Sequence, residues 1–313
     1  MEILFQIINV VKWLLLASIF IGVIVLVRGA LKRTRQIVVP RSQTTKKINN
    51  YHTHTIFCDG KNTAEEMVLK AIELGMDEIG FSGHSYLSGE PDWTMSLEDT
   101  KKYKETVLEL KEKYKDKINV RLGIEQDYWS PTDDLDDYEY VLGAVHSVFG
   151  DDTTWSSIDY TIENVSYCIK NYFDDDKMAM IEKYFELVAD LYNKTKCSVI
   201  CHFNLPTRFN TMFGDENGKP FVDMDDPRYI AAERKALEKI ATQPVIIEIN
   251  TGAMARGYTK EPYPNERALE IISKLQIPVL FSSDCHDVNY LTFGIEIVEE
   301  LVEKYDLNLL EKL

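Results

Sequence analysis

The chain has 313 residues, 45% of them hydrophobic, which is enough to bury one large core or two smaller ones. Its formal net charge of −16 is uneven, because residues 1–47 contain eight Lys or Arg and one acidic residue, whereas residues 48–313 carry a net −23. So acidic a domain repels the phosphate backbone, which argues against a nucleic-acid-binding protein.

An almost wholly apolar segment extends from Ile3 to Val27, and 25 helical residues are enough to cross a bilayer. Seven basic residues follow it up to position 47, and positive charge marks the cytoplasmic side of a membrane helix. We therefore expect residues 1–27 to anchor the rest of the chain, as a cytoplasmic domain, to the inner (cell) membrane, with residues 28–48 as a basic linker. A cleaved signal peptide fits less well because no basic stretch precedes the apolar segment, and an extension absent from the mature protein is the other alternative.

From residue 49 onward, short apolar stretches of β type alternate with helical patterns. Thr63 with Glu66 three residues later is typical of a capping box, and Gly75 is placed to end that helix. Regular alternation indicates parallel strands, and seven strand–helix units favour an α/β barrel over an open sheet. The expected strands are 49–55, 77–83, 119–126, 140–147, 197–203, 244–251 and 278–284. The expected helices are 63–75, 96–115, 161–171, 177–195, 228–241, 264–276 and 294–304.

The segment YHTHTIFCDG at residues 51–60 places three metal-type ligands at a predicted strand end. His52 and His54 are two residues apart, so in an extended strand both side chains point to the same face. Asp59 follows beyond the strand, next to Gly60. Imidazole and carboxylate ligands together suit Zn, Mn or Fe.

All six histidines fall at or just after the predicted C-terminal end of a strand, and in an α/β barrel those ends converge on the face that carries active sites. Alone, His146 or His202 would be interpreted as a core histidine. Six histidines on one rim instead indicate a metal centre. They are His52, His54, His84, His146, His202 and His286.

Two carboxylates join this predicted rim. Asp284 precedes His286 by two residues and therefore shares its face. Glu125 ends the third predicted strand after an apolar stretch, and Asp127 has the same parity and is the rival ligand. Five cysteines without regular spacing predict neither a disulfide framework nor a zinc finger, so we interpret them as packing residues in a reducing compartment.

From about residue 49 to the end, the chain resembles the PHP (polymerase and histidinol phosphatase) superfamily, and within it the PHP-type histidinol-phosphatases. The resemblance implies a distorted seven-stranded (β/α) barrel, in agreement with the strand count. The motifs that carry it are HTHTIFCDG at 52–60, GFSGHS at 80–85, LGIEQDY at 122–128, YVLGAVHSV at 140–148, CHFN at 201–204, EINTGAMARGY at 248–258, EPYPN at 261–265 and SSDCH at 282–286.

The resemblance also implies three divalent metal ions, Zn, Mn or Fe. Some relatives have histidine where Asp59 stands, and many have aspartate where this chain has Asn204, which would weaken the orientation of a neighbouring ligand. The implied ligands are His52, His54, Glu125 and Asp284 for one ion, bridging Glu125 with His146 and His202 for a second, and Asp59, His84 and His286 for a third.

Such a centre suits hydrolysis of a phosphate monoester by a hydroxide that bridges two metals, with Glu125, Asp284, Arg208 and Arg256 as the implied catalytic residues. Arg208 and Arg256 match basic family positions that contact phosphate, and arginine offers bidentate donors to such an anion. Either arginine could instead be an exposed surface residue. The proton donor to the leaving alkoxide stays open between a metal-bound water, Asp284 and a histidine.

We expect the substrate to be a small phosphate ester, L-histidinol phosphate, hydrolysed in histidine biosynthesis. Its amine and imidazole favour acidic and aromatic residues on the rim, with Tyr86, Glu90, Trp93, Asp127 and Tyr128 as candidates. The alternatives are another PHP phosphoesterase, such as a membrane-associated phosphotyrosine-protein phosphatase, and a metal-binding regulatory module without turnover. Loss of ligands would mark the regulatory module, and all nine positions hold competent ligands.

Overall fold

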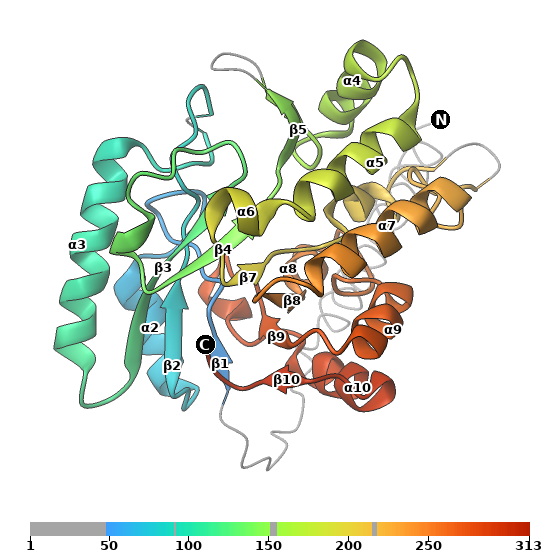
Figure 1. Cartoon of the computed structure of the whole chain (residues 1–313). Coiled ribbons are helices and arrows are strands. Elements are labelled where there is room, and N and C mark those ends of the chain that lie inside the picture. The colour runs from blue at the N-terminus through green and yellow to red at the C-terminus, as the bar shows by residue number, and fades with distance from the viewer. Residues whose placement is uncertain (1–47, 91, 151–154, 215–217) are drawn as a thin grey trace, which may run out of the picture. The chain divides into compact units, whose positions relative to one another are not determined.

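A wholly parallel sheet of eight strands forms the centre of the molecule, in the order β1-β2-β3-β4-β7-β8-β9-β10 (Figure 1). The computed structural model describes residues 48–90, 92–150, 155–214 and 218–313, which belong to one compact unit. All seven predicted strands are present, and β10 at the edge beside β9 was not predicted. The strands are β1 (Asn49–Asn50), β2 (Glu78–Phe81), β3 (Asn119–Asp127), β4 (Tyr140–Ala144), β7 (Val199–Ile200), β8 (Ile246–Asn250), β9 (Val279–Ser282) and β10 (Leu309–Leu310).

The sheet curls so that the segments following β1 and β9 pair with each other. Thr53 and Cys285 form a parallel bridge, in which the amide of His54 donates to the Cys285 carbonyl at 2.9 Å and the amide of Cys285 donates to the His52 carbonyl at 3.0 Å. This pairing brings β1, at one edge of the sheet, together with β9, the strand next to the other edge, at the C-terminal ends of the strands, and so curls the sheet toward a (β/α) barrel.

The helices lie around the outside of this sheet (Figure 1). The predicted capping box is confirmed, because Thr63 caps α2 and Glu66 accepts from the Thr63 amide at 2.8 Å. The single helix predicted at 177–195 is wrong, since the chain forms two helices separated at Ala189–Asp190. The helices are α2 (Ala64–Glu73), α3 (Leu97–Tyr114), α4 (Ile162–Tyr172), α5 (Lys177–Val188), α6 (Leu191–Thr195), α7 (Pro227–Ile240), α8 (Gly252–Ala255), α9 (Glu266–Leu275) and α10 (Ile295–Tyr305).

The predicted strand 140–147 ends early, at Ala144. The amide of His146 donates to the Asp127 carboxylate at 3.1 Å, so a side chain takes the place of a neighbouring strand as its partner. Beyond it the chain leaves the sheet and forms an antiparallel hairpin of β5 (Ser147–Gly150) and β6 (Trp155–Ser157), which the sequence did not predict. The hairpin leads to Ser157, Asp159 and Tyr160, which line the pocket described below.

Two apolar clusters stabilise the fold. The larger one packs helices against the outer face of the sheet, and the smaller one fills the barrel interior around Tyr51 and Tyr140. Gly80 and Gly123 make room for the Tyr140 side chain, because a Cβ at Gly80 would lie 2.3 Å from its hydroxyl oxygen and a Cβ at Gly123 would lie 2.2 Å from its ring. All five cysteines are free and four are buried, in agreement with their predicted packing role.

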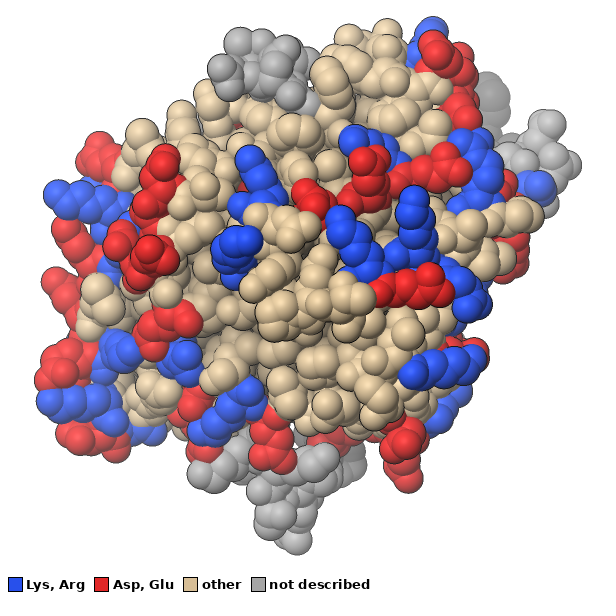
Figure 2. Space-filling view, in the orientation of Figure 1, with Lys and Arg blue, Asp and Glu red and all other residues tan. Residues whose placement is uncertain are grey.

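Acidic and basic side chains alternate over the face shown in Figure 2, so the acidic excess does not gather there in one patch. Within the described ranges, no helix is both long and apolar enough to cross a bilayer. The predicted anchor at residues 1–27, with its linker up to residue 47, lies outside the described residues.

Candidate metal centre

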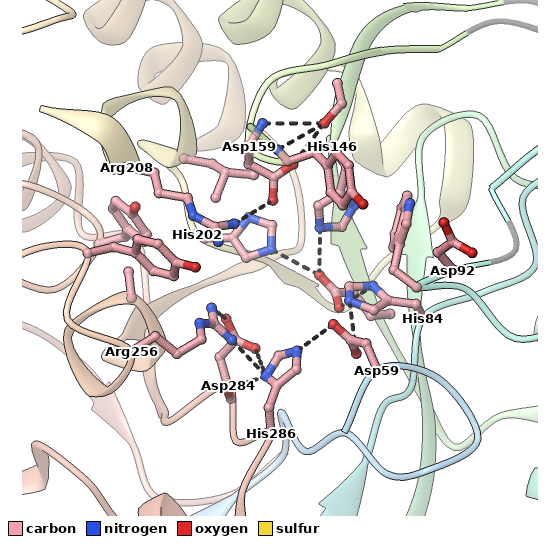
Figure 3. A pocket seen from close by; sticks show the side chains of 18 of the residues that line it. Asp59, His84, Asp92, His146, Asp159, His202, Arg208, Arg256, Asp284 and His286 are labelled. Carbon is pink, nitrogen blue, oxygen red and sulfur yellow. Dashed lines mark hydrogen bonds and ion pairs between the residues drawn. The ribbon is translucent and has the colours of Figure 1, made fainter. Parts of the chain in front are cut away.

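The nine predicted ligands come from the C-terminal ends of six parallel strands and converge on one pocket of about 450 Å³ (Figure 3). Seven of them line the pocket, and His52 and His54 lie fully buried against these. The converging strands are β1, β2, β3, β4, β7 and β9.

His52 and His54, from the segment after β1, face the Asp284 carboxylate. The Nε2 atoms of the two histidines lie 3.7 and 3.4 Å from Asp284 Oδ1, and 3.2 and 3.4 Å from Glu125 Oε2. These four side chains are the set predicted for the first ion. The i, i+2 spacing of the histidines therefore places both rings as expected.

Glu125, near the end of β3, lies at the centre of the cluster. Its Oε1 is 2.9 Å from His202 Nε2 and 3.4 Å from His146 Nε2, while its Oε2 is 2.9 Å from His84 Nδ1. One carboxylate oxygen thus faces the predicted second ligand set, and the other faces histidines of the first and third sets. This arrangement is the one that a bridging carboxylate needs.

Asp59, His84 and His286 form the third predicted set. Asp59 Oδ2 is 3.0 Å from His286 Nε2, and Asp59 Oδ1 is 3.7 Å from His84 Nε2. His54 joins this group through its Nδ1 atom, 3.4 Å from Asp59 Oδ1, and its ring stacks on His286 with centroids 3.9 Å apart. His54 therefore lies between the first and third sets.

The unpartnered atoms of the cluster fit divalent metal ions. His52 Nε2, His54 Nε2, His84 Nδ1 and Glu125 Oε2 are buried, and none forms a hydrogen bond with any described residue. Burying such atoms without a partner is costly, whereas imidazole nitrogen and carboxylate oxygen are good ligands for Zn, Mn or Fe. The described side chains can thus hold metal ions.

The carboxylates of the cluster are ionised. Burial would raise the pKa of Glu125, but its electrostatic interactions with the neighbouring histidines outweigh burial and hold the pKa well below its usual range. Burial acts in the same direction on Asp284, and there Arg256 and His52 outweigh it and hold the pKa well below its usual range. The cluster therefore presents full negative charges to cations.

Strained backbone positions coincide with two of the candidate ligands. His202 has φ 24° and Asp284 has φ 46°, a region that side chains other than glycine rarely adopt. Gly252, at the start of α8, makes room for Asp284, since a Cβ there would lie 2.6 Å from the Asp284 Cβ. The fold thus tolerates strain at the positions that aim these side chains into the pocket.

Two further carboxylates contact the Nδ1 atoms of His52 and His146 and so orient these rings, whose Nε2 atoms face Glu125. Glu248 of β8 accepts from His52 Nδ1 at 2.9 Å and from the His202 amide at 2.8 Å, and Asp127 lies 3.1 Å from His146 Nδ1. Such partners fix the tautomer of a ligating imidazole. Asp127, the predicted rival ligand, therefore supports His146 instead. Glu248 was missed, and its available signal was a carboxylate inside the apolar strand IIEIN.

Both predicted phosphate-binding arginines lie in the pocket (Figure 3). Arg256 donates to Asp284 Oδ2 at 3.0 Å and its Nη1 lies 2.7 Å from His286 Nδ1. Arg208 donates to Asp159 at 3.3 Å, and its guanidinium lies 3.9 Å from the centroid of the Tyr258 ring. Sequence reasoning missed Asp159 and Tyr258, which approach Arg208 from distant segments.

Of the predicted selectivity residues, Trp93 lines the pocket and packs against His84 and His146, with centroids 4.8 and 5.0 Å apart. Glu90 accepts from the Trp93 indole at 2.7 Å and so positions it. Tyr86 and Tyr128 are not among the residues that line the pocket, and the Tyr128 hydroxyl donates to Asp190 at 3.1 Å.

Asn204, where many relatives have aspartate, is committed to other partners. Its amide donates to the Tyr229 hydroxyl at 2.8 Å and to Glu233 at 3.1 Å, and its oxygen accepts from the Asn265 amide at 2.9 Å. Glu233 is fully buried and also accepts from Arg267 at 2.7 Å. Asn204 therefore ties the loop after His202 to α7 and α9.

A family model for the PHP domain matches residues 50–252, a range that contains seven of the nine candidate ligands. The chain belongs to the PHP domain family. Asp284 and His286 lie beyond the matched range, yet the pairing of the segments after β1 and β9 brings them to the same PHP site.

Known proteins extend this match over most of the chain. A histidinol-phosphatase of Bacillus subtilis is 25% identical over 267 residues, 78% of this chain and 96% of its own length. A structure from Listeria monocytogenes has a TM-score of 0.67 and 24% identity, covering 80% of this chain and 99% of its own. A histidinol phosphate phosphatase of Lactococcus lactis, solved with zinc, L-histidinol and phosphate, has a TM-score of 0.63 and 20% identity, covering 85% and 96%. The two structures share the fold of this chain.

Proposed function

We propose that this PHP-family protein is a metal-dependent phosphomonoesterase that hydrolyses L-histidinol phosphate to L-histidinol and phosphate. The observation that carries the proposal is one pocket in which a cluster of nine histidine and carboxylate side chains adjoins two arginines. The substrate is supported by the relatives, because the Bacillus subtilis protein is a histidinol-phosphatase and the Lactococcus lactis structure contains L-histidinol and phosphate.

The cluster is proposed to hold three divalent ions, Zn, Mn or Fe, on the three ligand sets that the sequence predicts. Bound divalent ions lower the pKa of water and neutralise charge on phosphoryl oxygens. Glu125 would bridge the first and second sets, since one of its oxygens faces His52 and His54 and the other faces His146 and His202. Glu248 and Asp127 would keep His52 and His146 in the tautomers that leave Nε2 free for a ligand.

Arg208 and Arg256 would bind the phosphoryl group. Both guanidinium groups point into the same part of the pocket in Figure 3. The Nε atom of Arg208 is buried without a hydrogen-bond partner among the described residues, so a donor remains for the substrate. Arg256 already contacts Asp284, which places its donors next to the metal ligands where the reacting group must lie.

The test is phosphate release by the purified full-length protein loaded with Zn or Mn. Three substrates are compared: L-histidinol phosphate, a phosphotyrosine peptide and a generic aryl phosphate. We expect efficient turnover of L-histidinol phosphate and poor turnover of the other two. A preference for the peptide would overturn the proposal in favour of a protein phosphatase, and the absence of turnover on all three would favour a metal-binding module without catalysis.

A further inference from the structure

Tyr263, in the loop before α9, has an exceptional hydroxyl group. Seven tyrosines are buried among the described residues, and the hydroxyls of the other six form hydrogen bonds. The Tyr263 hydroxyl is also buried but has no hydrogen-bond partner among these residues. Buried tyrosine hydroxyls normally form a hydrogen bond, so we expect a bound ligand to be the partner of this one.

The position of Tyr263 points to the nature of that ligand. The residue is 3% exposed and lines the candidate active-site pocket together with Arg208 and Arg256. The charges that act on its hydroxyl are those of both arginines and of the carboxylates that pair with them, Asp159 and Asp284. A group that accepts hydrogen bonds from two arginines and a phenol must carry several acceptor oxygens, as a phosphoryl group does.

The backbone holds Tyr263 firmly at this place. Its amide donates to the Asn250 carbonyl at 2.9 Å, and the Asn250 amide donates to the Tyr263 carbonyl at 2.7 Å. Asn250 is the last residue of β8, so the tyrosine is attached to the sheet that carries the metal ligands. A rigidly held donor loses little entropy when it binds a ligand.

We propose that the Tyr263 hydroxyl donates a hydrogen bond to the phosphoryl group bound beside Arg208 and Arg256. This substrate contact rests on the proposed phosphatase function. Burial raises the pKa of Tyr263 above its usual value and outweighs the lowering by the two arginines, so the phenol stays protonated as a donor at neutral pH.

The test compares Tyr263→Phe with a matched control, Tyr103→Phe, both in the full-length, metal-loaded protein. Tyr103 is also buried, but its hydroxyl donates to the Gly123 carbonyl at 2.7 Å and lies outside the pocket.

Binding of inorganic phosphate is measured by titration calorimetry, and Tm by thermal unfolding. We expect Tyr263→Phe to weaken phosphate binding about 10- to 100-fold without lowering Tm, because no protein hydrogen bond is lost. Tyr103→Phe is expected to lower Tm and leave phosphate binding unchanged.

Unchanged phosphate binding in Tyr263→Phe would overturn the proposal, and so would a fall in Tm as large as that of Tyr103→Phe, since it would reveal a protein partner. If Tyr263→Phe bound phosphate normally but hydrolysed alkyl phosphate esters with a lower kcat, the hydroxyl would contact the leaving group and not the phosphoryl group. Phosphate binding does not depend on which ester is hydrolysed. A failure of the proposed substrate can therefore be distinguished from a failure of this contact.

Discussion

At the scale of single residues, Glu125 is the central side chain of the candidate site. Its carboxylate lies within 3.4 Å of nitrogen atoms of five histidines, which come from four different strand ends. The charge of this carboxylate is as important as its shape, because histidines bind metal as neutral ligands, so that only the carboxylates of the cluster offset the charge of the cations.

Glu125→Gln should lower kcat by about 1,000-fold or more, because an amide of the same shape cannot bridge two cations. The same variant should bind fewer than three metal ions, which elemental analysis of the purified protein measures. Glu248→Gln serves as the comparison, with an expected loss of about 10- to 100-fold because Glu248 acts through His52. Wild-type turnover in Glu125→Gln would exclude a bridging role.

Arg256 should act mainly on substrate binding. Arg256→Lys keeps the charge but loses the planar pair of donors that now contacts Asp284 and His286, so we expect KM to rise about 10-fold with a smaller change in kcat. Steady-state kinetics on L-histidinol phosphate separates the two constants. Arg228→Lys is the matched control, because Arg228 pairs with Asp176 and Glu182 on the surface outside the pocket. An unchanged KM with a lower kcat would contradict a binding role.

At the scale of elements, the loop after His202 depends on the buried contact between Asn204 and Glu233. This contact joins three segments, since Glu233 belongs to α7 and also accepts from Asn265 at the start of α9. Arg208 lies in the short helix directly after Asn204, and Tyr263 lies two residues before Asn265. The contact therefore couples the fold to the geometry of the pocket.

Asn204→Asp, the change toward many relatives, should destabilise this protein by about 3 kcal/mol, because it places a second buried carboxylate next to Glu233. Repulsion raises the folded-state pKa of that carboxylate pair above its unfolded value, so the deficit is full at high pH and shrinks as pH falls through the raised pKa. Chemical denaturation at several pH values measures it. Adding Glu233→Gln should restore most of the stability, and a double variant as unstable as the single one would refute the coupling.

Local patterns in the sequence predicted the elements well, and contacts between distant segments explain what was missed. His52 with His54, and Thr63 with Glu66, are close in the chain, so strand parity and cap chemistry place them directly. Glu248 and Asp159 acquire their roles only when the fold brings the Glu248 side chain of β8 within reach of His52, and Asp159, which follows the β5–β6 hairpin, within reach of Arg208. Contacts of this kind cannot be predicted from the spacing of residues along the chain.

At the scale of the whole molecule, the metal ions should contribute strongly to stability. Three carboxylates and six histidines are crowded in one cluster, and ions that bind the folded state alone stabilise it by mass action. Chelation should lower Tm, with a loss of about 4 kcal/mol if the free ion had been present at about 1,000 times its Kd. Thermal unfolding before and after chelation and re-addition of Zn or Mn measures this. Glu125→Gln should show a smaller response, and an equal Tm with and without chelator would count against a structural role of the metals.

The predicted anchor makes a separate claim about the whole chain. Residues 1–27 are apolar enough to span a bilayer and are followed by basic residues, so we expect the full-length protein in the membrane fraction after cell lysis. A variant without residues 1–27 should appear in the supernatant. Extraction of the full-length protein by salt alone would contradict an anchor, because salt screens charges and does not release an inserted helix.

The pairing of the segments after β1 and β9 has a consequence in time. Asp59 and His286, which share the third ligand set, are 227 positions apart in the chain, and the first set likewise combines the beginning of the domain with its end. During synthesis from the N-terminus, the first histidines are made long before the residues that complete their coordination. A nascent or prematurely terminated chain that lacks Asp284 and His286 would therefore offer an incomplete ligand set, and full metal loading would have to follow the synthesis of these two residues.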